Sequence, residues 1–263
     1  MIKEHKVKNF NDYLEKINEL MLGVTLWFRG VSHPAYNLLP RIIWKNKYHL
    51  ENNYVNSFLR NYVLYTSASY SNPWDLYSLM QHYGLYTRLL DWTESPLYAL
   101  FFALTTDQNK NQDRVVWAMP PFELNEVTIG FPTVYTPGTL HNRNVSSENI
   151  KVDHIDSYLP TSVSPLDSGI LPEEPMAIYS TLNNPRIRGQ KGCFTIHGEF
   201  DTPLEEYANE LRAPFFFHKI ILKGSENMSS YITPLFNLGI NEEHIYQDLD
   251  SMVKRIIREN ESS

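Results

Sequence analysis

An arginine stands directly after a short apolar stretch near the N-terminus, in the sequence Trp27-Phe28-Arg29-Gly30. A guanidinium at the end of a strand can hold a phosphate through two parallel hydrogen bonds. Gly30 lets backbone or ligand approach closely. The stretch predicts an arginine that binds an anion, although a structural pair between an arginine and a carboxylate uses the same residues at least as often.

A second polar segment, residues 81–96, lies immediately before an apolar run and should sit at the edge of the core. We expect the Asp91 carboxylate to be largely buried and paired with Arg88 or Arg186, because a buried carboxylate needs a cationic partner. The alternative is that these residues only organise this corner of the fold.

A third polar segment, residues 184–194, places Gln190 in a turn framed by Gly189 and Gly192. A glutamine can hold a hydroxyl or an amide, but it cannot act as a general base. We expect Arg29, the segment 88–93 and Gln190 to line one shared cleft, because each polar group lies beside apolar neighbours at the end of an expected strand.

Charge along the sequence favours an anionic ligand near Arg29. Residues 27–60 hold five basic residues and one acidic residue, a local balance of +4, whereas the whole chain carries −7. The net negative charge argues against broad attraction to nucleic acid, but a local basic patch suits a dinucleotide or a short single strand. A solvated helix face is the alternative for the lysines of this patch.

Composition narrows the class of protein. The chain of 263 residues is 42% hydrophobic and 20% charged, which is typical of a globular domain. The lone Cys193 cannot form an internal disulfide, and we see no membrane span, so we expect a cytoplasmic protein without a membrane partner. The histidines do not cluster at the spacing of metal ligands, and no phosphate-binding loop or nucleophile elbow is present.

Periodicity and capping signals predict the elements. We expect helices over about 11–21, 50–66, 73–84, 95–104 and 242–258, and strands over about 24–28, 115–119, 177–181, 192–197 and 215–222. The run 99–104 is apolar on every face and should be the central buried helix. Residues 120–176 look irregular. The mixture predicts one α+β domain over residues 1–263, with its core motifs at about 24–250 and a mixed or antiparallel sheet flanked by helices.

The three segments together resemble the FRG-domain family, which is named for a Phe-Arg-Gly motif matched here by residues 28–30. The blocks 81–84 and 87–96 match the family's central motif. Residues 184–194, 238–240 and 246–250 match its later motifs in order, so the resemblance covers nearly the whole chain.

The motif layout also resembles, more distantly, the ADP-ribosyltransferase fold. That resemblance implies NAD as a substrate, with Arg29 on the first strand, Thr93 with Asp91 and Trp92 on the second, and Gln190 on the third. Gln190 departs from the glutamate that transferases carry there, which shifts the carboxylate role to Asp91 or Glu199.

The implied function is an NAD-dependent ADP-ribosyltransferase, acting as a toxin or an anti-phage defence effector on RNA, DNA or protein and held in check by an antitoxin or another regulatory protein. The alternative is a non-catalytic module that binds a nucleotide or a protein in the same cleft. The catalytic candidates are Arg29, Asp91 and Gln190. The candidates for holding NAD are Arg29, Gly30, His82, Tyr83, Arg88, Trp92, Thr93, Ser95 and Arg186.

Overall fold

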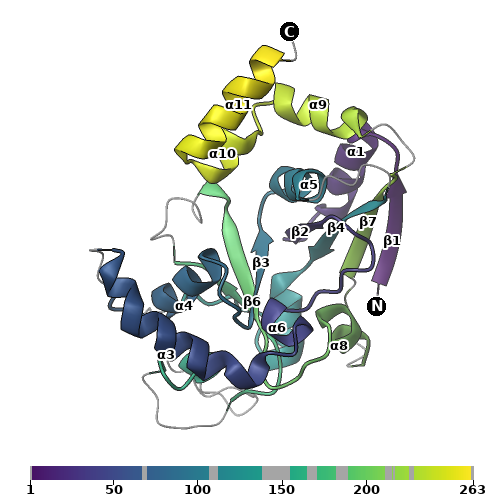
Figure 1. Cartoon of the computed structure of the whole chain (residues 1–263). Helices are drawn as coiled ribbons and strands as arrows, with labels where there is room; N and C mark the ends of the chain where they lie inside the picture. Colours follow the sequence, from purple (N-terminus) through teal and green to yellow (C-terminus); the bar gives the residue numbers. More distant parts are fainter. Residues whose placement is uncertain are drawn as a thin grey trace.

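The computed structural model describes most of the chain, and its residues form one mostly antiparallel sheet flanked by helices (Figure 1). The described residues are 2–66, 70–106, 112–137, 155–164, 171–181, 189–210, 215, 217–224 and 228–261. This arrangement confirms the α+β class and the mixed sheet expected from the sequence.

The sheet has seven strands in the order β1-β7-β4-β2-β3-β6-β5. Neighbouring strands are antiparallel except β1 and β7, which are parallel. The strands are β1 (Ile2–Val7), β2 (Trp27–Val31), β3 (Leu89–Thr93), β4 (Arg114–Met119), β5 (Met176–Tyr179), β6 (Gly192–Ile196) and β7 (Phe217–Leu222).

The helices cover both faces of this sheet. The N-terminal half holds α1 (Phe10–Leu20), α2 (Arg41–Trp44), η1 (Tyr48–Leu50), α3 (Glu51–Asn61), η2 (Tyr62–Leu64), α4 (Pro73–His82), α5 (Pro96–Thr105) and α6 (Pro121–Ile129). The rest holds η4 (Ile155–Tyr158), α8 (Leu204–Glu210), α9 (Ser229–Asn237), α10 (Glu242–Tyr246) and α11 (Leu249–Glu261). The last three form the yellow run beside α5 in Figure 1.

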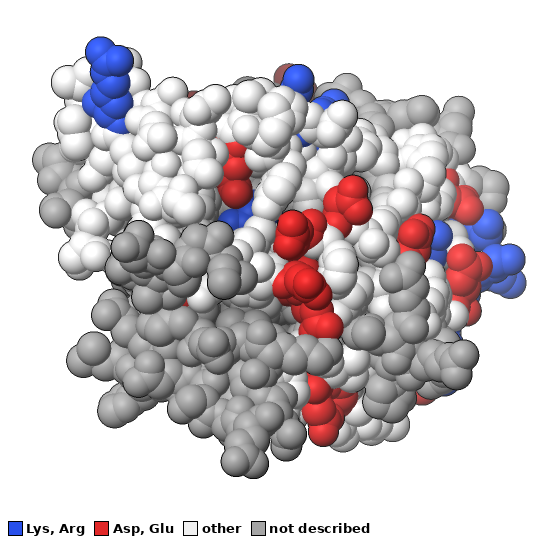
Figure 2. Space-filling view, turned by 90° about the horizontal axis from the view of Figure 1, so that it is seen from below, with Lys and Arg blue, Asp and Glu red and all other residues white. Residues whose placement is uncertain are grey.

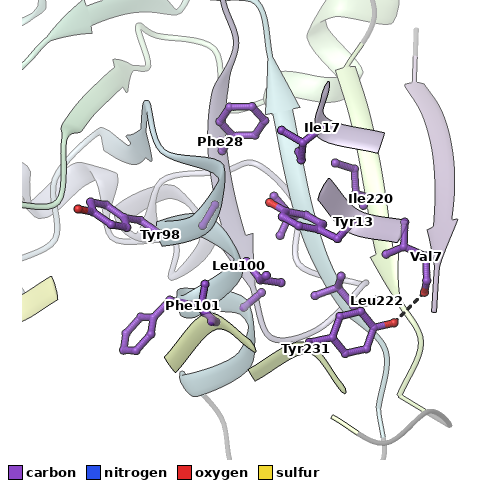
Figure 3. Close-up of a cluster of buried hydrophobic side chains, with 14 of the residues drawn as sticks. Val7, Tyr13, Ile17, Phe28, Tyr98, Leu100, Phe101, Ile220, Leu222 and Tyr231 are labelled. Carbon is purple, nitrogen blue, oxygen red and sulfur yellow. Dashed lines mark hydrogen bonds between the residues drawn. The ribbon is translucent and has the colours of Figure 1, made fainter. Parts of the chain in front are cut away.

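The apolar helix α5 is the central element of one core, as the sequence predicts. The Ser95 side chain caps it by accepting from the Tyr98 amide at 3.4 Å, and Pro96 fills its first turn. Its buried side chains pack with those of β2, β4, β7 and α1 (Figure 3). A Cβ on Gly30 would lie 1.9 Å from the Ala99 carbonyl oxygen, so glycine lets β2 and α5 approach closely.

A second group of helices packs on the other end of the sheet. Side chains of α3 and α4 are buried together with those of β3, β6 and β5. Side chains of α6 and α8 cover the opposite face of the central strands. Strands β3 and β6 therefore lie between helices on both sides.

Three expectations about elements were wrong. Strand β2 begins at Trp27 rather than near residue 24. Residues 89–93 form β3, a strand that the family resemblance implied but the periodicity did not predict. The expected last helix is broken at Gln247, whose left-handed φ of 53° separates α10 from α11. The segment 120–176 contains α6 and η4 within its described part.

Within the described residues, no helix combines the length and the apolar character needed to cross a membrane.

Candidate functional site

A pocket opens where the neighbouring strands β2 and β3 separate. The two strands pair at one position, Phe28 with Thr93, although each continues beyond it. The pocket fills the gap that follows and has a volume of about 480 Å³. Its lining residues are Arg29, Val31, Ala35, Tyr36, Asn37, Leu39, Arg41, Trp44, Gln81, Gly84, Leu85, Leu89, Leu90 and Asp91.

Arg29 spans the gap between the strands. Its Nη1 donates to the Asp91 carbonyl oxygen at 2.7 Å and lies 3.9 Å from the Asp91 Oδ2. The Arg29 Nε is buried and has no hydrogen-bond partner among the described residues. Burial lowers the pKa of Arg29, and the charge of Asp91 acts against that shift. The arginine thus stays protonated and keeps a donor that an anion in the pocket could use.

Among the described residues, Asp91 is the one acidic residue in the lining of this pocket. The Gln81 Nε2 donates to its Oδ2 at 3.0 Å, and the Thr87 hydroxyl donates to the Gln81 Oε1 at 2.5 Å. The Thr87 bond fixes the amide with its nitrogen toward the carboxylate. The side chain of Asp91 is 58% exposed, so the carboxylate is oriented by two neighbours and remains open to the pocket.

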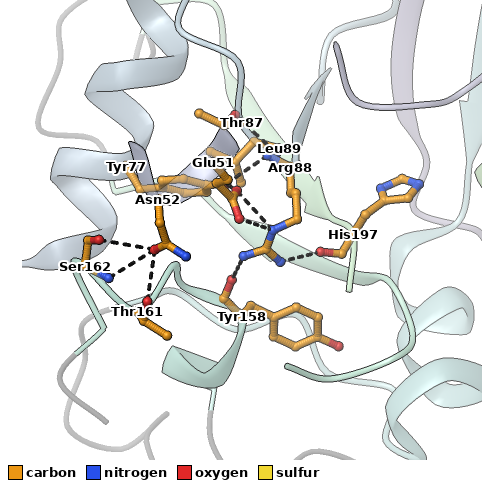
Figure 4. Close-up of polar contacts among 10 residues, drawn as sticks. All are labelled: Glu51, Asn52, Tyr77, Thr87, Arg88, Leu89, Tyr158, Thr161, Ser162 and His197. Atoms are coloured by element: carbon orange, nitrogen blue, oxygen red, sulfur yellow. Dashed lines mark hydrogen bonds and ion pairs between the residues drawn. The ribbon is translucent and has the colours of Figure 1, made fainter. Parts of the chain in front are cut away.

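The expectation that Asp91 is buried and paired with Arg88 is wrong. Arg88 is 1% exposed and its guanidinium binds Glu51, at the start of α3, through Nε at 3.0 and 2.9 Å (Figure 4). It also donates to the carbonyl oxygens of His197, at 2.8 Å, and of Tyr158. Arg88 points into the core, while Asp91 lies at the solvent-open gap. The other expected partner, Arg186, lies outside the described residues.

A smaller pocket of about 60 Å³ adjoins the first. Gln190, His82 and Trp92 contribute to its lining, and Asp91 and Gln81 line both pockets. The turn that carries Gln190 is tied to β3, because the Thr93 hydroxyl donates to the Gln190 carbonyl oxygen at 2.7 Å. Arg29, Asp91 and Gln190 therefore line two pockets that share Asp91 and Gln81, whereas Arg88 of the expected segment 88–93 lines neither.

Other expected contacts to a ligand are used inside the fold instead. Gly30 meets the backbone of α5, and the Trp92 indole nitrogen donates to the Thr195 hydroxyl at 3.0 Å. Ser95 caps α5. Tyr83 is exposed at the end of α4 and does not line either pocket. Arg88 is enclosed, so the two pockets retain Arg29, Asp91, Gln190, His82 and Trp92 from the expected set.

Sequence reasoning missed several pocket residues. Gln81 belongs to a motif that we singled out, but its role in orienting Asp91 depends on the bond from Thr87. Arg41 was counted only as part of a local charge, and Tyr36 and Trp44 gave no signal because exposure cannot be read from composition. Within the described residues, no cluster of His, Cys, Asp and Glu could hold a metal ion.

The segment that builds most of the larger pocket matches a known protein family. Residues 24–112 match the family model of the FRG domain. The chain contains an FRG domain. This domain supplies β2, α2 to α5 and β3, and hence Arg29 and Asp91, whereas Gln190 and β6 come from beyond the matched segment. The comparisons with curated proteins and with solved structures found no match.

Proposed function

We propose that the two pockets bind NAD and that the chain is an ADP-ribosyltransferase-like enzyme. The observation that carries the proposal is the pairing of Arg29 with Asp91 across the gap between β2 and β3. A cation with a buried, unused donor and an exposed carboxylate thus stand a few ångströms apart in one pocket. These are the two groups that binding of a diphosphate and cleavage at a ribose require.

Arg29 and Arg41 give the larger pocket its affinity for an anion. Both line the pocket, and Arg41 is exposed with no carboxylate among the described residues in ion-pair contact. A guanidinium matches the geometry of a phosphate oxygen pair better than an ammonium does. The diphosphate of NAD would therefore lie on the Arg29 side of the pocket, with the nicotinamide ribose toward Asp91.

Asp91 would assist the chemical step electrostatically. When the bond between the ribose C1′ and the nicotinamide nitrogen breaks, the electron pair leaves with nicotinamide and positive charge develops on the ribose. A fixed carboxylate stabilises that charge. An acceptor nucleophile then forms the new bond to C1′, and its proton passes to the Asp91 carboxylate. Gln190 would hold a ribose hydroxyl from the smaller pocket, because an amide can donate and accept but cannot take a proton.

Gln190 also supports a second candidate function, a module that binds a nucleotide without cleaving it. The Asp91 carboxylate is the only one in the lining of the two described pockets, and an amide stands in the turn before β6. If Asp91 does not serve the reaction, the site still offers two arginines and a pocket of suitable size for a nucleotide.

Calorimetric titration with NAD, ATP and ADP-ribose tests the proposal at the level of binding. We expect NAD to bind to wild-type protein and Arg29→Ala to abolish binding. Arg60→Ala, which removes an exposed arginine of α3 that lines neither pocket, should leave binding unchanged. Chromatography of the same mixtures then follows release of nicotinamide. Binding without release would favour the non-catalytic module, and absence of NAD binding would overturn both the cofactor and the reaction.

A further inference from the structure

The segment that follows β2 forms a fixed wall at the mouth of the larger pocket. Leu38 and Ile42 are buried, and the Leu38 amide donates to the Glu205 carboxylate oxygens at 3.2 and 3.0 Å. The Leu204 amide donates back to the Leu38 carbonyl oxygen at 3.0 Å. Between these anchors Pro40 is buried and Arg41 is exposed, on a backbone that is held in place.

Three aromatic rings adjoin one another on this wall. The ring centroids of His33 and Tyr36 are 5.5 Å apart, and those of Tyr36 and Trp44 are 6.2 Å apart. Tyr36 is 46% exposed and Trp44 is 59% exposed. Single exposed rings are common on protein surfaces. Adjoining exposed rings at the mouth of a pocket are instead a platform on which flat ligands can stack.

Cations without carboxylate partners among the described residues lie on the same segment as these rings. The Lys45 Nζ is 4.2 Å from the centre of the Trp44 ring, and the Arg41 guanidinium is 4.8 Å from the Tyr86 ring. Lys47 is exposed two residues further on. Among the described residues, no carboxylate forms an ion pair with any of the three. We call Tyr36, Arg41, Trp44, Lys45 and Lys47 the stacking strip.

Acidic residues limit the width of the stacking strip. Glu199 and Asp201 line a separate pocket of about 250 Å³ together with Asn46, Tyr48 and His49. The face seen from below carries a band of acidic side chains (Figure 2). A duplex on the strip, with phosphates on both strands, would meet the carboxylates of Glu199 and Asp201, whereas a single strand can follow the rings and cations alone.

We infer that the stacking strip binds a short single strand of nucleic acid, with bases on Tyr36 and Trp44 and phosphates at Arg41, Lys45 and Lys47. Every base can stack on an aromatic face. The strip should therefore distinguish single strands from duplexes more strongly than it distinguishes one sequence from another. Because Tyr36, Arg41 and Trp44 of the strip also line the pocket of Arg29 and Asp91, the bound strand is the acceptor of the ADP-ribose unit. The acceptor role rests on the proposed function, but the binding does not.

The fluorescence of Trp44 can report this binding directly. The chain has five tryptophans, and the other four, Trp27, Trp74, Trp92 and Trp117, are at most 3% exposed. A stacked base quenches indole emission, so titration with oligonucleotides about eight nucleotides long should quench Trp44 saturably. Single-stranded RNA and single-stranded DNA form two arms of the titration, and a duplex of the same sequence forms the third. If three cations contact phosphates, a plot of the logarithm of the association constant against the logarithm of the salt concentration should have a slope of about −2.

Matched variants locate the binding by fluorescence anisotropy of a labelled strand. We expect Trp44→Ala and Lys45→Ala to weaken binding about tenfold each. The controls Tyr65→Ala and Arg60→Ala remove an exposed ring and an exposed cation outside the strip and should bind as wild type does. These substitutions are all of exposed side chains, so the variants should fold.

The outcomes separate this inference from the proposed function. Quenching by single strands, with loss in the strip variants, supports the stacking strip even if NAD is never consumed, although the acceptor role would then be overturned. Transfer of labelled ADP-ribose from NAD to the strand supports both. Equal binding of the duplex, or no binding at low salt, would overturn the inference while the proposed function stands. Transfer to protein but not to nucleic acid would overturn the acceptor role of the strand.

Discussion

The Arg88 guanidinium and the Glu51 carboxylate form a buried ion pair that joins β3 to the start of α3, with the Tyr77 hydroxyl donating to Glu51 and accepting from the Arg88 amide at 2.8 Å. Burial acts to lower the pKa of Arg88, but the charge and hydrogen bonds of Glu51 raise it above its ordinary value. This pair holds β3, and with it Asp91, against the helices on which the site depends.

Removing one partner of this pair should strongly destabilise the folded protein. We expect Glu51→Ala to lower the free energy of unfolding by about 3–5 kcal/mol, because it leaves a buried arginine without its counter-ion. Urea denaturation followed by circular dichroism measures the change. The matched control is Glu206→Ala, which removes an exposed carboxylate of α8 and should change stability by less than about 0.5 kcal/mol. Equal stability of the two variants would show that the pair is not structural.

The close approach of β2 and α5 makes Gly30 intolerant of a side chain. A Cβ there would meet the backbone of Ala99 and Ala103 at 1.9 and 2.6 Å, so Gly30→Ala should destabilise the protein by about 3 kcal/mol or more. At Gly23, where φ is 76° and no atom lies within 4 Å, alanine should cost only about 1 kcal/mol of backbone strain. Thermal melts of both variants test this, and a tolerant Gly30 would contradict the packing of α5.

Stability should fall in mild acid because of His197. Burial, together with the charge of Arg88, lowers the pKa of His197 to about 3. The unfolded chain takes up this proton near pH 6.5. The free energy of unfolding therefore decreases as the pH falls from about 6.5 toward 3. Above that window His197 does not change it. At pH 5 the loss is about 2 kcal/mol.

Urea unfolding at pH 7 and pH 5 measures this loss. In His197→Phe, which cannot titrate, the difference between the two pH values should shrink by about that amount. An unchanged difference would mean that His197 is protonated in the folded protein, contrary to its burial beside Arg88.

Local signals in the sequence predicted much of the fold. The capping serine and proline before residues 97–104 predicted α5, and its apolar character predicted that it is buried. The partner of Arg88 could not be predicted, because Glu51 lies 37 residues away and carries no local sign of burial. Periodicity alone missed strand β3, because a charged residue stands in its centre. Asp91 can occupy that position only because β2 and β3 separate there, which is a property of the sheet rather than of the segment.

The bond from Thr93 to the turn of Gln190 should matter for NAD cleavage more than for stability. Thr93→Val removes the hydroxyl that donates to the Gln190 carbonyl oxygen at 2.7 Å, and we expect it to lower kcat about tenfold. Thr93→Ser keeps the hydroxyl and should restore most of the rate. Steady-state release of nicotinamide measures both variants. Equal rates in the valine and serine variants would separate Gln190 from the reaction.

Cleavage of NAD by an Asp91→Asn variant tests the central proposal most directly. The side chain is exposed, so the substitution should leave the melting temperature unchanged, and Asp250→Asn on α11 is the matched control for the loss of an exposed carboxylate. Arg29→Lys, which keeps the charge but loses the fork of donors, should weaken NAD binding about tenfold. In Asp91→Asn we expect NAD to bind as in wild-type protein, while release of nicotinamide falls about 100-fold. Wild-type rates in this variant, or a wild-type protein that binds NAD and never releases nicotinamide, would contradict a transferase at this site.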